Sequence, residues 1–194
     1  MDVTLTIATR RAYRSLAPAE ISDDLIHDLA RHAGLAPSCS NMQPWRFIFV
    51  RGAEALTALH EALTPNNAWM KAASALIAVC GRVEDDCIVK DREYLLFDLG
   101  LASAFLILRA TELGLVAHPV AGFSPQKTRA VLRIPEVYRI ISLIALGRKS
   151  DTVSPILSPK QAQEESVRPA RLTLDRIVSI DRFADAVPPA GNPA

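Results

Sequence analysis

The stretch from Ala36 to Val50 reads APSCSNMQPWRFIFV and joins two kinds of structure. Pro37 disfavours a helical conformation at the residue before it, so a preceding helix should end here. Between Pro37 and Pro44 lie small and amide side chains, which offer hydrogen-bond donors and acceptors without charge. The run from Trp45 to Val50 is aromatic and β-branched, as strands are. A polar loop between a helix and a strand is a common small-molecule site, although an ordinary helix-capping turn would have the same composition.

The composition predicts one globular domain. Of the 194 residues, 49% are hydrophobic and 22% are charged, which is enough apolar material for a core of its own. The net charge of +1 gives no general attraction for nucleic acid or an anionic membrane. Cys39, Cys80 and Cys87 form neither an even set nor a CxxC motif, so reduced thiols are expected. Because the chain shows no signal region near its start, we expect a cytoplasmic protein without a membrane segment.

Helical and strand patterns alternate along the chain. Ser22 is a candidate N-cap, since two aspartates follow it in the expected first turn. We expect helices over residues 22–33, 53–63, 94–113 and 124–132, and strands over residues 46–51, 74–80, 115–120 and 138–146. Gly147 should stop the last strand, and residues 150–168 resemble a polar arm more than a core element. This alternation predicts a mixed α/β sandwich around one sheet.

The segment from Tyr94 to Leu113 is apolar almost all round, apart from Asp98, Arg109 and Glu112. A helix of this composition must be buried on more than one side. In a chain of this size, a second subunit would bury the side of the helix that the chain itself leaves exposed, which predicts a homodimer.

A second motif lies upstream, where Arg10-Arg11-Ala12-Tyr13-Arg14 places three cations within five residues. Alone it would also fit a solvated basic turn. Together with the polar loop it resembles the nitroreductase family of FMN-dependent oxidoreductases, which carry an RRSxR-like motif and then APSxxNxQPW before a strand. The resemblance extends from about Arg10 to Ile180. It implies an α+β three-layer sandwich, with a mixed, mainly antiparallel central sheet flanked by helices.

The resemblance also implies a domain organisation. Residues 1–183 would form one FMN-binding domain, whose C-terminal arm at about 148–180 would reach the partner subunit. Residues 184–194, rich in proline, alanine and glycine, would be a flexible tail.

The expected cofactor-binding residues follow from the matching positions. Arginine suits a phosphate because its planar fork meets two oxygens at once. The resemblance places Arg10 and Arg171 at the FMN phosphate, with Arg168 beside them and Arg14 near the pyrimidine edge of the ring. The remaining expected contacts come from four segments: Arg11 and Ala12; Ser38, Cys39, Ser40, Asn41 and Gln43; Asn66; and Pro119, Val120, Ala121 and Gly122. Cys39 is expected to be a small packed side chain in place of serine, with redox chemistry as the alternative.

No catalytic dyad and no metal-binding spacing is expected, because hydride chemistry belongs to the flavin. The resemblance implies that NADH or NADPH reduces FMN, which then reduces a nitroaromatic, quinone or similar small conjugated acceptor by a ping-pong mechanism. With no GxGxxG motif, the nicotinamide would dock transiently over the flavin. His118 borders the loop expected beside the flavin and is a candidate proton donor.

Three positions depart from the family pattern: Ala12 replaces serine, Phe105 replaces asparagine, and Ala121 replaces glutamate. These departures keep two alternatives open. One is another flavin reaction of the same superfamily, namely dehalogenation, flavin fragmentation or dehydrogenation. The other is a flavin-binding protein without turnover.

Overall fold

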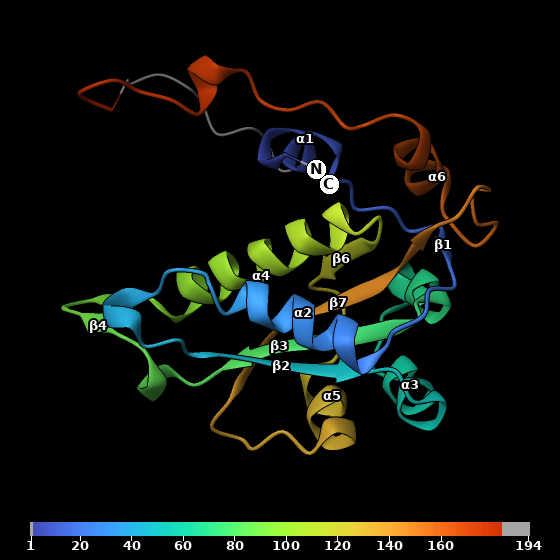
Figure 1. Ribbon diagram of the computed structural model, residues 1–194, viewed down its shortest axis with the longest axis horizontal. Helices are drawn as coiled ribbons and strands as arrows, with labels where there is room; N and C mark the ends of the chain where they lie inside the picture. Colours follow the sequence, from blue (N-terminus) through green and yellow to red (C-terminus); the bar gives the residue numbers. More distant parts are fainter. Residues whose placement is uncertain (1, 184–194) are drawn as a thin grey trace.

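One antiparallel sheet organises the chain in the computed structural model, which describes residues 2–183 (Figure 1). The sheet has five strands, and β7 (Arg139–Lys149) is its centre. β3 (Ala75–Gly81) pairs with one edge of β7, and β2 (Trp45–Val50) lies outside β3. β6 (Val116–Val120) also pairs with β7, and the short β1 (Leu16–Ala17) pairs with the last two residues of β7. A separate hairpin joins β4 (Ile88–Val89) and β5 (Arg92–Glu93).

Helices cover both faces of this sheet and make three layers (Figure 1). β3 is buried along its whole length, and its side chains alternate between two hydrophobic clusters, as the two-residue period of a strand requires. Ala75, Ile77 and Val79 face the cluster that includes α2 (Asp23–Ala33) and α4 (Leu95–Glu112). The opposite cluster includes residues of α3 (Ala53–His60), the 3-10 segment η2 (Pro65–Ala72) and α5 (Pro125–Leu132). The predicted three-layer sandwich with a mainly antiparallel sheet is confirmed, and every pairing in the described sheet is antiparallel.

Local signals fixed several helix ends. The Ser22 hydroxyl accepts a hydrogen bond from the Leu25 amide, which makes it the N-cap of α2. α4 ends before Gly114, whose φ of +75° is the left-handed conformation common after a helix. Gly147, by contrast, does not stop β7, because Gly147 pairs with Val116 and the last two residues of the strand pair with β1. That prediction was wrong, because pairing with β6 and β1 continues the strand past Gly147 and outweighs the local tendency of glycine to end a strand.

The ends of the chain hold further short elements. α1 (Val3–Thr9) opens the described chain and is followed by the arginine motif. After β7 the polar stretch contains a helix, α6 (Pro159–Ser166), that composition did not predict. Beyond α6 the chain, including the 3-10 turn η4 (Leu174–Arg176), runs along the outside of the sandwich over α1 (Figure 1). The remaining turns are η1 (Cys39–Asn41) and η3 (Val83–Asp85). The expected tail at 184–194 lies outside the described residues.

No helix within residues 2–183 has both the length and the apolarity needed to cross a membrane.

Candidate functional site

A pocket of about 200 Å³ forms where the segment after α1 meets the segment after α6. Both segments bring arginines to it, although more than 150 residues separate them in sequence. The pocket contains every arginine that the sequence assigned to a cofactor. It is lined by Arg10, Arg11, Ala12, Arg14, Glu164, Arg168, Pro169 and Arg171.

The positive charge of this pocket is only partly neutralised. Burial and the neighbouring charges of Arg168 and Arg171 hold the pKa of Arg10 below its ordinary value. Within residues 2–183, neither Arg10 nor Arg171 forms an ion pair with a carboxylate. Arg168 instead donates to the backbone carbonyls of Ala8 and Arg10, at 2.8 and 2.7 Å. Three converging guanidiniums that lack a counter-charge favour the binding of an anion.

Two glutamates of α6 hold the arginine motif in place. The buried Glu165 carboxylate accepts hydrogen bonds from the amides of Arg14 and Ser15, at 2.8 and 3.0 Å. Glu164 forms an ion pair with Arg14 at 2.9 Å, and its backbone carbonyl accepts from Arg11 at 2.5 Å. Sequence reasoning missed both glutamates. A signal for the helix was present, because Ser158 and Gln161 form a capping box at its start.

A connected set of contacts leads from the arginine motif to the loop after β6. His118 donates from Nδ1 to the Tyr13 carbonyl at 3.0 Å, and its ring lies 4.6 Å from the ring of Trp69. The Trp69 indole donates to Asn67, and the Asn67 amide donates to the Gly122 carbonyl at 2.9 Å. Thr64 donates to the same carbonyl at 2.9 Å. A β-carbon at position 122 would lie 2.5 Å from the Asn67 amide nitrogen, so any other residue here would have to displace that side chain.

Not all of the cofactor residues expected in this region are placed to contact a ligand. Asn67 rather than Asn66 holds the loop, and Asn66 is exposed, with its carbonyl accepting from Gln161 of α6. Val120 is buried in the sheet, whereas Pro119 and Ala121 are exposed. A ligand over this loop would therefore meet Pro119, Ala121 and the backbone near Gly122 first.

His118 is uncharged at neutral pH. Its side chain is 8% exposed, and burial lowers its pKa to about 4. Its Nδ1 hydrogen is already used by the Tyr13 carbonyl. The proton-donor role remains a prediction, and the contacts described here support an orienting role between the arginine motif and Trp69.

The polar loop has an unusual backbone. Ser40, Asn41 and Gln43 have φ values of 48°, 59° and 53°, a left-handed region that costs non-glycine residues on the order of 1 kcal/mol each. Several hydrogen bonds support the loop; among them, the Gln43 backbone amide donates to the Ser38 hydroxyl at 3.0 Å, and the Cys39 backbone amide donates to buried Asp98 of α4 at 2.7 Å. The side chains of Ser40, Asn41 and Gln43 are exposed, as binding residues must be.

The expectation of three reduced thiols was wrong. Cys39 and Cys87 form a disulfide between the polar loop and the segment before β4, with their Cα atoms 5.9 Å apart. Only Cys80 is a free thiol, and it is buried in β3. Sequence spacing could not show this pair, since 48 residues separate the two cysteines.

The expected cofactor residues fall into two groups at opposite ends of the sheet. The chain runs from the arginine motif to β1 at one end, whereas the loop between α2 and β2 lies at the other end, beside β4 (Figure 1). The arginine pocket, the loop after β6 and Asn66 belong to the first group, and the polar loop forms the second. Within one chain, the length of the sheet separates the two groups (Figure 1).

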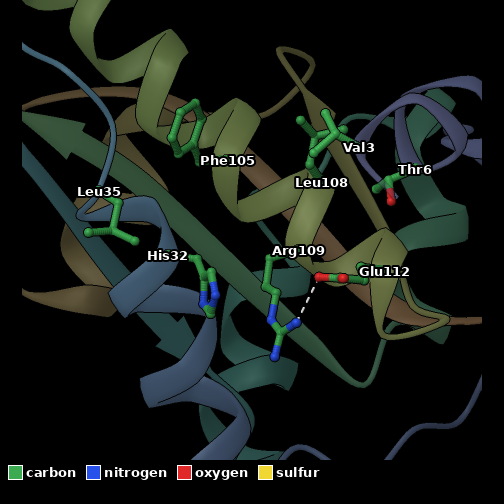
Figure 2. Close-up of a pocket in the computed structure, with 8 residues that line it drawn as sticks. All are labelled: Val3, Thr6, His32, Leu35, Phe105, Leu108, Arg109 and Glu112. Atoms are coloured by element: carbon green, nitrogen blue, oxygen red, sulfur yellow. Dashed lines mark hydrogen bonds and ion pairs between the residues drawn. The ribbon is translucent and has the colours of Figure 1, made fainter. Parts of the chain in front are cut away.

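A second hollow of about 320 Å³ lies between α1, α2 and α4 and is mainly apolar (Figure 2). Its charged groups are paired, because Arg109 bonds Glu112 at 2.7 Å and Asp28 at 2.6 Å. It therefore offers no free cation for an anionic ligand. It is lined by Val3, Thr6, His32, Leu35, Phe105, Leu108, Arg109 and Glu112.

The comparisons with known proteins agree with this architecture. The Nitroreductase family model matches residues 7–148. A candidate NADH dehydrogenase/NAD(P)H nitroreductase of Archaeoglobus fulgidus is 34% identical over 152 residues, covering 75% of this chain and 84% of the relative. The chain belongs to the nitroreductase family. The family is one of oxidoreductases, and its match covers the arginine motif, the polar loop and the sheet as far as Arg148 in β7.

Solved structures of nitroreductase-like proteins share the fold. A structure described as an oxidoreductase containing FMN aligns with a TM-score of 0.81 at 28% identity, covering 95% of this chain and 94% of the other. A nitroreductase-like protein of Exiguobacterium sibiricum, solved in complex with FMN, has a TM-score of 0.77 at 21% identity, covering 92% and 97%. The second likeness shows the fold alone.

Proposed function

We propose that this nitroreductase-family protein is an FMN-dependent oxidoreductase that uses NADH or NADPH to reduce small conjugated acceptors such as nitroaromatics or quinones. The observation that carries the proposal is the arginine pocket, where Arg10, Arg168 and Arg171 converge and form no ion pair with any carboxylate within residues 2–183. A phosphate monoester is the part of FMN that riboflavin lacks, and it supplies the missing charge. The FMN named in the description of the solved structure that is 28% identical to this chain supports the same cofactor.

The two groups of residues suit the two halves of the cofactor. Arg10, Arg168 and Arg171 would hold the phosphate, while Arg11 and Arg14 are already bonded to Glu164. The polar loop would meet the ring system with Ser38, Ser40, Asn41 and Gln43, which offer neutral donors and acceptors. When bound, FMN would supply the capacity to accept and return a hydride. The Arg14 charge and the backbone near Gly122 would stabilise negative charge at the ring, which is the contribution of the protein to the chemistry.

A homodimer would bring the two groups together. Because they lie at opposite ends of one sheet, a complete site needs the arginine pocket of one subunit and the polar loop of the other. The outward face of α4 provides an apolar surface for such pairing, with Leu96 and Phe97 exposed by 54% and 63% and Phe105 by 38%. The part of the arm beyond Arg171, whose apolar side chains are also exposed, would contact the partner.

Donor and acceptor would alternate at one face of the cofactor. The sequence has no GxGxxG motif for a dedicated nicotinamide domain, so a ping-pong pattern is expected in initial rates. Initial-rate lines that intersect, as a ternary complex requires, would contradict this part of the proposal. The expected location remains the cytoplasm.

The cofactor assignment is tested by the absorption spectrum of the purified protein, with the released chromophore identified by mass. Flavin bands, an FMN mass and bleaching of the bands by NADH or NADPH under anaerobic conditions are expected. A bound flavin that neither nucleotide reduces would indicate a flavin-binding protein without this turnover. Absence of flavin even after incubation with FMN would overturn the proposal.

A further inference from the structure

The disulfide between Cys39 and Cys87 lies at the base of the polar loop. Both cysteines are partly exposed, so a small thiol can reach them. The third cysteine offers a contrast, because Cys80 is buried and burial raises the pKa of its thiol. The chain therefore has one accessible disulfide and one sheltered thiol among its described residues.

Two buried carboxylates lie beneath this disulfide. The Cys39 amide donates to Asp98 and the Cys87 amide donates to Asp86, each at 2.7 Å. The second oxygen of Asp86 has no hydrogen-bond partner among the described residues, and burial together with the nearby Asp98 raises the pKa of Asp86. Each cysteine of the disulfide therefore donates its backbone amide to one of these two buried carboxyl groups.

The same bond supports a backbone that would otherwise relax. The left-handed residues Ser40, Asn41 and Gln43 directly follow Cys39. Such conformations persist only where surrounding contacts determine them. Here those contacts include the disulfide, the hydrogen bond to Asp98 and the hydrogen bond from the Gln43 backbone amide to the Ser38 hydroxyl.

We propose that the Cys39–Cys87 disulfide is a thiol–disulfide exchange site, and that its reduction weakens flavin binding by releasing the polar loop. The effect on flavin rests on the proposed function, whereas the exchange itself does not. The co-reactant is a dithiol, which can reduce a disulfide completely. In the reducing cytoplasm that we expect for this protein, disulfides are usually transient and sensitive to redox state.

Atoms, electrons and protons balance in this exchange with the dithiol as the only other reactant. One thiolate of the dithiol attacks a sulfur of the disulfide, forms a mixed disulfide and releases the other cysteine as a thiolate, which takes the proton that the attacking thiol lost. The second thiol of the reductant then attacks the mixed disulfide and releases the second cysteine as a thiol. The dithiol is oxidised to a disulfide, and the protein gains two thiols.

The test compares oxidised protein with protein treated with dithiothreitol. Alkylation followed by peptide mass analysis reports the thiols, and quenching of FMN fluorescence reports the Kd. Reduction is expected to expose Cys39 and Cys87 to alkylation and to weaken FMN binding about tenfold, with recovery on reoxidation. Cys87→Ser should bind FMN as weakly as the reduced protein and should not respond to dithiothreitol, whereas Cys80→Ser should behave as the unmodified protein.

Two results would overturn the inference. One is alkylation of Cys39 and Cys87 before any reductant is added. The other is an FMN Kd that is the same in both redox states. A protein that binds no FMN in either state would instead remove the proposed function, and the masses would still decide whether the disulfide exchanges.

Discussion

At the scale of single residues, the argument for an anionic ligand rests on charge that the protein leaves without a partner. Arg14 has Glu164 as its counter-ion, but Arg10 and Arg171 have none among the described residues. Holding several guanidiniums together without a counter-ion destabilises the fold. Such an arrangement is explained by a ligand that supplies the negative charge.

Replacing Arg171 should therefore distinguish the contribution of the phosphate to binding from that of the rest of the cofactor. Arg171→Ala is expected to weaken FMN binding about 10- to 100-fold, because hydrogen bonds to charged groups contribute about 1.5–3 kcal/mol. Riboflavin, which lacks the phosphate, should bind the variant and the unmodified protein equally. Lys127→Ala removes the same charge from α5, away from the pocket, and is the control. An equal loss for both flavins would contradict the assignment of the phosphate.

His118 gives a prediction about pH. Its folded pKa of about 4 lies below the value of 6.5 for a free imidazole, so the unfolded chain binds the proton more readily. The resulting stability is fully present above about pH 6.5 and is lost as the pH falls towards 4, by up to about 3 kcal/mol.

Urea unfolding at several pH values measures this effect. His118→Asn keeps a donor for the Tyr13 carbonyl but cannot titrate, so its free energy of unfolding should fall less between pH 7 and pH 4.5. Comparing the variant with the unmodified protein also removes the contribution of His60, whose pKa is lowered by burial in both proteins. Parallel pH profiles would show that His118 is not a buried neutral imidazole.

At the scale of elements, sequence signals worked where local chemistry decides and failed where a distant partner decides. The N-cap at Ser22 and the end of α4 before Gly114 depend on neighbouring residues, and both were predicted. α6 was missed because its residues are polar and its stability comes from contacts with residues 11–15. The disulfide and the continuation of β7 past Gly147 likewise depend on segments far away in sequence.

The contact between α6 and the arginine motif can be tested directly. Glu165→Ala leaves the amides of Arg14 and Ser15 without their acceptor, so the free energy of unfolding should fall by about 2 kcal/mol. FMN affinity should also fall, because Arg168 and Arg171 follow α6. Gln163→Ala, at an exposed position of the same helix, should change the stability by less than about 0.5 kcal/mol. Equal behaviour of the two variants would show that α6 does not position the pocket.

At the scale of the whole molecule, the expected cofactor residues could be named from the sequence, but the sequence could not show that they lie in two places. The family motifs identify the arginine segment and the polar loop, and only the fold places them at opposite ends of the sheet (Figure 1). The apolar length of α4 was a sequence signal for a second subunit, beside the family resemblance, and the structure leaves Leu96 and Phe97 exposed on that helix.

A charge on this face should oppose dimer formation. Phe97→Asp is expected to shift the protein from dimer to monomer in sedimentation velocity, because burying an unpaired carboxylate costs several kcal/mol. Val137→Asp introduces the same charge at an exposed site outside α4 and should remain dimeric. FMN binding should weaken together with dimer formation. A dimeric Phe97→Asp protein would place the interface elsewhere.

The central claim, a flavin site shared by two subunits, is tested most directly by mixing two defective variants. Arg171→Ala impairs the pocket, and Asn41→Asp places a negative charge in the polar loop. Each variant alone should bind little FMN. After the two are unfolded together and refolded, half of the dimers should be mixed, and each mixed dimer has one intact site. FMN titration should then recover roughly a quarter of the sites of the unmodified protein. No recovery, although mixed dimers form, would mean that each chain builds its site alone and would contradict the account.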